Sequence, residues 1–226
     1  MRNRIVRGFR NFWGSERGLS IFLVLLLVNM FLVPPLISPG VLARVIFEAF
    51  FALLLLTGVA SVSSSRWMRW VLGAAAIAAV GLRSVDRLLP SSGFDQAGAA
   101  ATVLSAGLLA LVVLAQVFRA GPVTVHRILG AVAAYLLFGL TWAAVYHLVN
   151  VLAPGAFAGA QMGSGVNASS YVYFSFVTLT TVGYGDVTPL HPVARSFAVL
   201  EALTGQLYPA ILLARLVSLE LLDRAR

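Results

Sequence analysis

The chain contains one short run whose residue types and spacing could bind an ion, TLTTVGYGD at residues 178–186. It reads as the end of an apolar helix followed by a Gly-X-Gly segment, in which Gly183 and Gly185 permit the positive φ angles that other residues avoid. Because glycines alternate with larger residues, consecutive main-chain carbonyls can turn to the same side, which an ordinary strand does not allow. Such a column of oxygens, with the Thr181 hydroxyl below it, can replace the hydration shell of a K⁺ ion.

A pore must be lined from all sides, but the chain carries only one such run. A single loop supplies oxygens on one side of an ion, so several copies of the loop are needed to surround it. The run therefore predicts a homo-oligomer with the ion path between its subunits.

The composition independently indicates a membrane protein. Hydrophobic residues make up 60% of the 226 residues, charged residues only 11%, and the mean hydropathy is +0.93. A soluble domain usually carries about 25% charged residues. The absence of cysteine excludes disulfides and thiol catalysis, and the absence of lysine excludes a Walker-type phosphate loop. The sequence offers no convergent set of catalytic residues near the membrane midplane, so we do not expect an enzyme.

Hydrophobicity predicts an all-α membrane protein with six transmembrane helices, plus a short re-entrant helix and a loop between the last two. The spans are expected at residues 19–37, 41–62, 70–82 (continuing toward 89), 97–118, 128–152 and 193–217. The pore helix is expected at 169–179, too short to cross a bilayer, with a polar loop at 90–96 and a Gly-rich outer loop at 153–168. The chain then divides into a basic arm (1–18), a four-span sensor-like domain (19–122) and a pore domain (123–226).

The distribution of arginine predicts the orientation. The net charge is +8, and arginine accumulates in the N-terminal arm, after the second and fourth spans, and near the C-terminus. Basic residues collect on the cytoplasmic side, so both termini are expected inside and the loop at 178–186 opens outside. We expect a plasma membrane, and the all-Arg, Ala-rich composition favours a bacterial inner membrane.

The basic residues also bear on partners. The arginines are scattered between spans rather than gathered on one face, so nucleic-acid binding is not expected. The aromatic-spaced arm at 1–18 suits either a helix lying on anionic lipid headgroups or a disordered basic tail.

The run at 178–186, with the apolar segments around it, resembles the pore loop of tetrameric potassium channels. The resemblance covers about the last hundred residues and rests on the signature Thr-Thr-Val-Gly-Tyr-Gly-Asp. It implies a homotetramer that conducts K⁺ selectively and passively, with K⁺ in the filter and no other cofactor. The resemblance implies that K⁺ is coordinated by Thr181, Val182, Gly183 and Tyr184. It also implies that Gly185 completes the filter and that Asp186 lies at the outer mouth.

Six spans with a pore between the last two resemble the voltage-gated branch of that family. Voltage sensing needs several charges that move through the field, each contributing about 2.3 kcal/mol per 100 mV. The family places Arg at every third position of the fourth span, whereas residues 97–118 contain none. A strong voltage dependence carried by this span is therefore not expected.

Residues around the run are expected to support the pore helix and filter: Tyr173, Phe174, Val177, Thr178, Thr180 and Glu201. Many relatives carry a carboxylate where this chain has Val177. Glu201, at filter depth on the last span, is expected either to brace the pore helix from behind or to form an ion pair with Arg195 or a neighbouring subunit. In several relatives a pore-helix Trp holds the outer-mouth Asp; here Tyr173 and Phe174 match that position, so the strut is a tyrosine hydroxyl or is absent.

The last span also carries an expected hinge. Gly205 lies 20 residues after Gly185, the separation at which the family places its inner-helix hinge, and Pro209 one turn later removes a backbone donor. We predict a bend or gate at Gly205, the alternative being that it only permits close packing against the pore helix. Gln206 is expected to face the cavity below the filter.

A few other polar residues remain. Arg44 and Glu48 are four apart on the second span, so they can form an intramembrane ion pair, either functional or structural. The three histidines, His126, His147 and His191, are too dispersed to predict a metal site.

Two other functions compete with a channel: a potassium-uptake transporter subunit and a non-conducting modulatory channel subunit. Such transporters put four pore units in one longer chain, whereas this chain has one unit with the whole Gly-Tyr-Gly run. Few residues follow the last span, so we expect no cytosolic ligand-binding domain there. Gating is left open between the filter, lipid, the basic arm, and an unknown ligand or partner.

Overall fold

The computed structural model describes residues 16–28, 30, 52–53, 66–88, 92–118, 124–159 and 168–224. The predicted ion pair of Arg44 and Glu48, most of the basic arm and nearly all of the second span lie outside the described residues.

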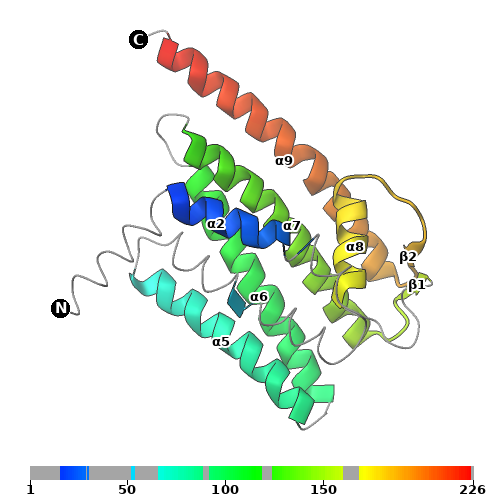
Figure 1. The fold of residues 1–226 in the computed structure, drawn as a ribbon. Coiled ribbons are helices and arrows are strands. Elements are labelled where there is room, and N and C mark those ends of the chain that lie inside the picture. Colours follow the sequence, from blue (N-terminus) through cyan, green and yellow to red (C-terminus); the bar gives the residue numbers. More distant parts are fainter. Residues whose placement is uncertain are drawn as a thin grey trace, which may run out of the picture.

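The described part of the chain is mostly helical (Figure 1). Its elements in chain order are α2 (Glu16–Leu27), α5 (Arg66–Leu88), α6 (Ser92–Val117), α7 (Val125–Leu152), β1 (Phe157–Gly159), α8 (Ala168–Leu179), β2 (Val187–Pro189) and α9 (Pro192–Arg224). Three stretches among them are long and apolar enough to cross a membrane: Gly93–Val117, Arg127–Leu152 and Pro192–Ser218. The helical fold and these three helices agree with the prediction, while the count of six spans stays a prediction.

The structure corrects three boundaries. The third helix begins before the expected residue 70: α5 starts at Arg66 and includes Arg69, and its N-terminal tryptophans Trp67 and Trp70 are each 77% exposed. The polar loop expected at 90–96 is shorter, because α6 already begins at Ser92 and places Asp95 in its first turn, where the helix dipole favours an acidic side chain. The outer loop at 153–168 contains strand β1, which pairs antiparallel with β2, so the all-α prediction omitted a small two-stranded sheet.

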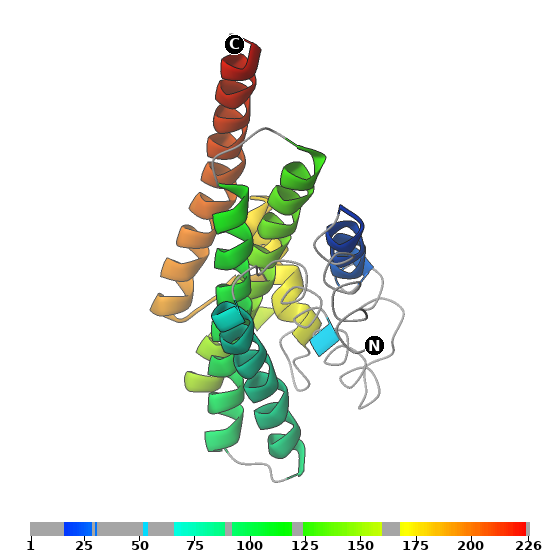
Figure 2. The same ribbon diagram turned by 90° about the vertical axis from the view of Figure 1, so that its left-hand side faces the viewer.

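The helices form a packed group with α9 at one side. Helix α6 packs between α5 and α7, α2 packs on α7, and α8 packs against both α7 and α9. Figures 1 and 2 show the C-terminal part of α9 projecting beyond the other helices. The short α8 and the sheet therefore lie beside the N-terminal half of α9, which directly follows them in the chain.

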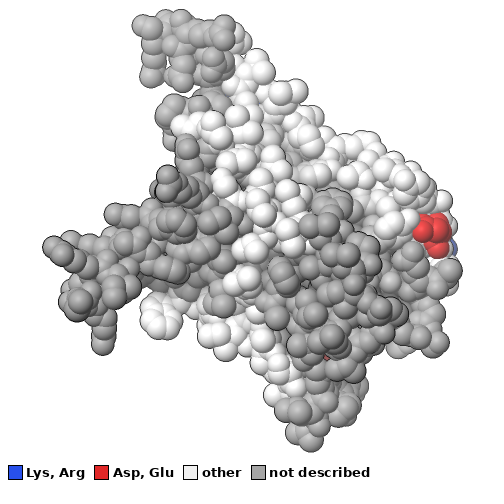
Figure 3. Space-filling model, viewed as in Figure 1, with Lys and Arg blue, Asp and Glu red and all other residues white. Residues whose placement is uncertain are grey.

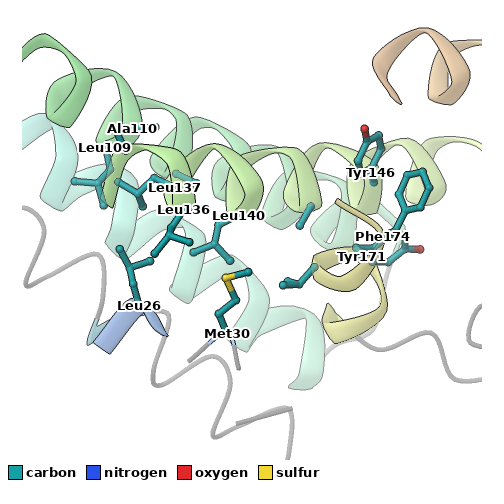
Figure 4. Close-up of a cluster of buried hydrophobic side chains, with 14 of the residues drawn as sticks. Leu26, Met30, Leu109, Ala110, Leu136, Leu137, Leu140, Tyr146, Tyr171 and Phe174 are labelled. Atoms are coloured by element: carbon teal, nitrogen blue, oxygen red, sulfur yellow. The ribbon is translucent and has the colours of Figure 1, made fainter. Parts of the chain in front are cut away.

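The core follows helix α7 along its length (Figure 4). At one end Leu109 of α6, Leu137 of α7 and Leu26 of α2 belong to this core, and all three are at most 1% exposed. At the other end Tyr146 of α7 meets Phe174 of α8, with ring centroids 4.9 Å apart. Small buried residues on the facing helices, Ala106, Ala110, Ala133 and Ala134, allow the close approach that holds helices together in lipid.

Much of the apolar surface remains uncovered in the single chain. Only 11% of the most apolar stretch of α9 is buried, and Leu203, Leu207 and Leu213 are each at least half exposed. On the face drawn in Figure 3 the described residues are almost all uncharged, and acidic atoms gather at one edge. Such a surface suits lipid or another chain rather than water.

Candidate functional site: the loop between helix α8 and helix α9

The loop after α8 has the alternating backbone that the glycine spacing predicts. Helix α8 ends at Leu179, and φ is positive at every second residue that follows, 59° at Thr181, 59° at Gly183 and 78° at Gly185. Alternation between left-handed and ordinary conformations turns successive carbonyls to one side. Thr181 is the one non-glycine residue with a positive φ in the described part of the chain, and a β-branched residue holds that conformation only under strain.

Main-chain hydrogen bonds tie the start of this loop to the last turn of α8. The carbonyl of Val177 accepts from the amides of Val182 (2.9 Å) and Gly183 (3.2 Å), and the carbonyl of Thr178 accepts from Thr181 (2.9 Å). These bonds continue past the helix end and offset the strain at Thr181. The loop therefore folds back against the C-terminal end of α8, where the helix dipole is negative and favours a cation.

A tyrosine strut holds the far end of the loop. The Tyr173 hydroxyl donates to Oδ2 of Asp186 over 2.8 Å, so of the two alternatives left by the sequence the strut is present. Hydrogen bonding to the carboxylate raises the pKa of Tyr173, which keeps the phenol protonated as a donor. Phe174 points elsewhere: it is 6% exposed and packs against Tyr146 and Phe157.

The two-stranded sheet fixes the backbone directly after the loop. Strand β2 begins at Val187, directly after Asp186, and pairs with β1 in the register Gly159–Val187. The amide of Leu190 extends the pairing by donating to the carbonyl of Ala156 over 2.8 Å. Gly159 has a φ of 144°, and a Cβ added there would lie 2.4 Å from the Asp186 carbonyl oxygen, so only glycine fits.

Behind α8, Glu201 is completely buried and joins three helices. Its Oε2 lies 2.5 Å from the hydroxyl of Tyr146 on α7, and its Oε1 lies 2.5 Å from the hydroxyl of Ser175 on α8. Arg195, the partner in the alternative reading, directs its Nε to the carbonyl of Pro189 instead. This arrangement supports the expected brace; sequence reasoning missed Ser175 and Tyr146, because a lone hydroxyl in an apolar helix gives no signal of its partner.

Gly205 lies where α9 crosses the end of α8. A Cβ added to Gly205 would be 1.9 Å from the carbonyl oxygen of Leu179, so the two backbones approach as closely as glycine allows. Helix α9 runs through both Gly205 and Pro209 without interruption. The close packing that was the alternative reading is present, and the hinge stays a prediction.

The remaining predicted residues lie at or near the open side of the loop. In the single chain Val182 is 53% exposed and Tyr184 is 72% exposed, although both are large and apolar or aromatic. Gln206 is also exposed, and the Thr180 hydroxyl donates back to the carbonyl of Phe176 over 2.6 Å. The predicted coordinating residues therefore stand together along one uncovered edge.

The donor set favours main-chain oxygen over side-chain ligands. The described residues contain no group of three or more His, Cys, Asp or Glu that could hold a metal ion. The loop offers a cation main-chain carbonyl oxygens, the ligand type that can replace the hydration shell of K⁺.

Comparison with known proteins finds similarity over the part of the chain that contains this loop. Residues 134–220 match the family model described as "Ion channel". The chain is 38% identical over 85 residues to Two pore potassium channel c of Oryza sativa subsp. japonica, covering 38% of this chain and 17% of that protein. It is 36% identical over 87 residues to Protein LctB of Bacillus caldotenax, covering 37% of this chain and 64% of that protein. It is 33% identical over 75 residues to the inward rectifier potassium channel Kirbac3.1 of Paramagnetospirillum magnetotacticum, covering 33% of this chain and 22% of that protein.

The chain spans less than two thirds of the length of each of these relatives. No solved structure gives a significant match to it. The matched segment nevertheless includes most of α7, all of α8, the loop and most of α9. Residues 134–220 thus match an ion-channel family model, and over much of that stretch the chain is similar to two proteins named as potassium channels.

Proposed function

We propose that the chain is a subunit of a K⁺-selective channel in which four identical chains surround one ion path. The observation that carries the proposal is the alternation of positive φ at Thr181, Gly183 and Gly185 in a loop tied to a short helix. Each subunit contributes one quarter of the carbonyl ligands that replace the water around K⁺. Conduction is passive, as ions displace one another through adjacent sites.

The surface of the single chain supports assembly around an axis. Val182 and Tyr184 are more than half exposed, and the neighbouring α9 presents an apolar face with Val199 and Leu203 uncovered. Packing four copies with their loops facing inward covers the loop residues and leaves the outer faces of α6 and α9 to lipid. Asp186, at the outer end of each loop, then forms a carboxylate ring that concentrates cations.

Strong voltage gating is not part of the proposal. Between Gly93 and Val117, the apolar stretch of α6 carries one charged residue, Asp95, in the first turn. Each sensing charge supplies only about 2.3 kcal/mol per 100 mV, so a helix without a charge ladder responds weakly to the field. The gating stimulus would come from lipid, from the filter or from an unidentified ligand or partner.

The membrane arrangement completes the proposal. Six spans, four in the sensor-like domain (19–122) and two in the pore domain (123–226), place both termini on the cytoplasmic side of a plasma membrane. The basic arm at 1–18 then meets anionic headgroups. Arg44 and Glu48 pair within the second span, and Gly205 with Pro209 forms the bend of the inner helix.

The test is flux from the purified protein in liposomes, K⁺ against Na⁺, with voltage-step currents beside it. Within its own chain Gly183→Ala meets no neighbouring atom within 4 Å, but it imposes a side chain on a φ of 59°, so it strains the backbone of the loop. That strain costs about 1–2 kcal/mol per subunit, which predicts a loss of K⁺ flux of roughly tenfold or more. Gly93→Ala, an exposed site in α6 with nothing within 4 Å, is the matched control and should leave flux unchanged.

The same preparation tests assembly and the alternatives. Native mass spectrometry should give four chains per particle. Equal K⁺ and Na⁺ flux, or flux that survives Gly183→Ala, would overturn the proposal. Absence of flux from a well-folded tetramer, restored by co-reconstitution with a conducting channel, would instead indicate the modulatory subunit.

A further inference from the structure

The hydroxyl of Ser175 has two hydrogen-bond partners but only one proton. Its Oγ lies 2.7 Å from the carbonyl oxygen of Gly139 on α7 and 2.5 Å from Oε1 of Glu201 on α9. Ser175 and Glu201 are both completely buried, so water does not complete either contact. A serine hydroxyl offers one donor and two acceptor lone pairs, so the second contact needs a proton from elsewhere.

The direction of each bond follows when all three contacts are hydrogen bonds. The carbonyl of Gly139 can only accept, so its contact takes the serine proton. The contact between Ser175 and Glu201 then requires a proton on Oε1, and the Tyr146 hydroxyl supplies the proton for the contact at Oε2. Three contacts use three protons only when Glu201 is a neutral acid; an ionised carboxylate leaves one contact without a proton.

We propose that Glu201 is a protonated positioning residue at the centre of a directed chain, from Tyr146 to Glu201 to Ser175 to the carbonyl of Gly139. The inference deepens the proposed channel function and relies on it only where K⁺ flux is the readout. These hydrogen bonds run from α7 to α9, from α9 to α8 and from α8 back to α7. They therefore hold the pore helix α8 between the two long helices.

The surroundings favour the neutral form. From α7, the titratable groups facing Glu201 are Tyr146, which donates to it, and Tyr135, which lies within electrostatic reach. From α8 the facing group is Ser175, and on α9 itself Arg195 is directed to the carbonyl of Pro189. A buried carboxylate without a cationic partner is costly, whereas a buried acid whose oxygens are all hydrogen-bonded is not.

The position of Ser175 explains why this proton matters for the filter. Ser175 lies two residues before Val177, whose carbonyl receives the amides of Val182 and Gly183. A shift of α8 at Ser175 therefore moves the acceptor that holds the filter backbone. At the same position of α7, Gly139 has no room for a Cβ against the Phe176 ring, so the pore helix cannot move closer to α7 as compensation.

The inference predicts which substitutions of Glu201 preserve these hydrogen bonds. In Glu201→Gln the amide group donates to Ser175 and the amide oxygen accepts from Tyr146, so every bond keeps its direction. In Glu201→Ala the bonds to both hydroxyls are lost. An ionised Glu201 would instead accept hydrogen bonds from both hydroxyls. In Glu201→Gln the side-chain NH₂ group would then face a hydroxyl that also donates, and that hydrogen bond would be lost.

The experiment combines K⁺ flux in liposomes with infrared spectroscopy of the wild-type tetramer, Glu201→Gln and Glu201→Ala. We expect Glu201→Gln to keep flux within about twofold of wild type and Glu201→Ala to lose roughly tenfold or more, since unpaired buried partners cost more than conserved bonds. Raising the pH should reduce wild-type flux as Glu201 loses its proton and leave Glu201→Gln flat. A neutral-acid carbonyl stretch present in wild type should be missing in Glu201→Gln.

Glu220→Gln, the same substitution at another position of α9, is the control and should retain the neutral-acid band. The proposal is overturned if Glu201→Gln is as impaired as Glu201→Ala, or if the wild-type spectrum lacks the band. Failure of the channel function is distinguishable: wild type without flux that still shows the band contradicts conduction and supports the proton on Glu201. Because the band and Glu201→Gln decide the question, it stays testable even when Glu201→Ala does not fold.

Discussion

The guanidinium of Arg215 on α9 donates to the main-chain carbonyl of Phe118 at the end of α6, with Nη2 and the oxygen 2.6 Å apart. The same guanidinium lies over the Phe118 ring, 4.9 Å from its centroid. Helix α6 ends at Val117, so this carbonyl is one of the acceptors that a helix C-terminus leaves without an intrahelical partner. A cation placed there also suits the negative end of the helix dipole. One side chain thus joins the C-terminal part of α9 to the end of α6.

Arg215→Gln should weaken this junction. A hydrogen bond to a charged group contributes about 1.5–3 kcal/mol, and most of that is lost when the charge is removed. We expect a lower thermal midpoint of the tetramer and a changed open probability, measured by calorimetry and single-channel recording. Phe118→Ala removes the ring but leaves the carbonyl, so its effect should be the smaller of the two. Equal effects would assign the junction to the ring contact alone.

Tyr173→Phe should destabilise the outer end of the filter. It removes the donor to Asp186 while leaving the ring and the fold in place. We expect K⁺ current to decay faster during sustained opening, because the carboxylate is no longer held. Asp186→Asn keeps an acceptor oxygen and should be milder than Asp186→Ala. In an Asp186→Ala background Tyr173→Phe should have no further effect, and additive decay rates would mean that the two residues act separately.

Gly159→Ala should disrupt the sheet that holds the exit of the loop. The new Cβ would lie 2.4 Å from the Asp186 carbonyl and would also occupy a positive φ. Gly155→Ala is the matched control, since it has a φ of 82° but no atom within 4 Å. The control measures strain alone, about 1–3 kcal/mol. Gly159→Ala should lose more, in thermal stability and in K⁺ flux; equal losses would show that the sheet moves without consequence for the filter.

Gly205→Ala separates a hinge from a packing contact. A hinge glycine replaced by alanine should leave a folded tetramer with altered opening, whereas the clash with the Leu179 carbonyl predicts loss of the tetramer itself. Gly81→Ala in α5 meets nothing within 4 Å and should be neutral or stabilising by about 0.5–1 kcal/mol, as alanine is the better helix former. Size-exclusion chromatography of both variants distinguishes the two roles. A stable Gly205→Ala tetramer with changed gating would favour the hinge.

The backbone of the loop could be anticipated from local sequence. Glycine spacing alone predicted positive φ at Gly183 and Gly185, because the freedom of a residue to adopt that conformation depends on its own side chain. The lengths of α7 and α8 and the position of α9 were likewise predictable, since an apolar run is recognised by its length and its neighbours. The positive φ at Thr181 could not be anticipated. A threonine adopts it only when hydrogen bonds to the carbonyls of Val177 and Thr178 impose it.

The sequence by itself determined that this protein is apolar, and it predicted one ion-binding loop that needs further copies around an axis. Tertiary structure alone decided which side chains stand behind the loop. Tyr146 and Glu201 are 55 residues apart, and Phe118 and Arg215 are 97 residues apart. Such pairs depend on how each helix is rotated about its axis when it packs. That rotation is set by the summed fit of many side chains, which a one-dimensional pattern does not record.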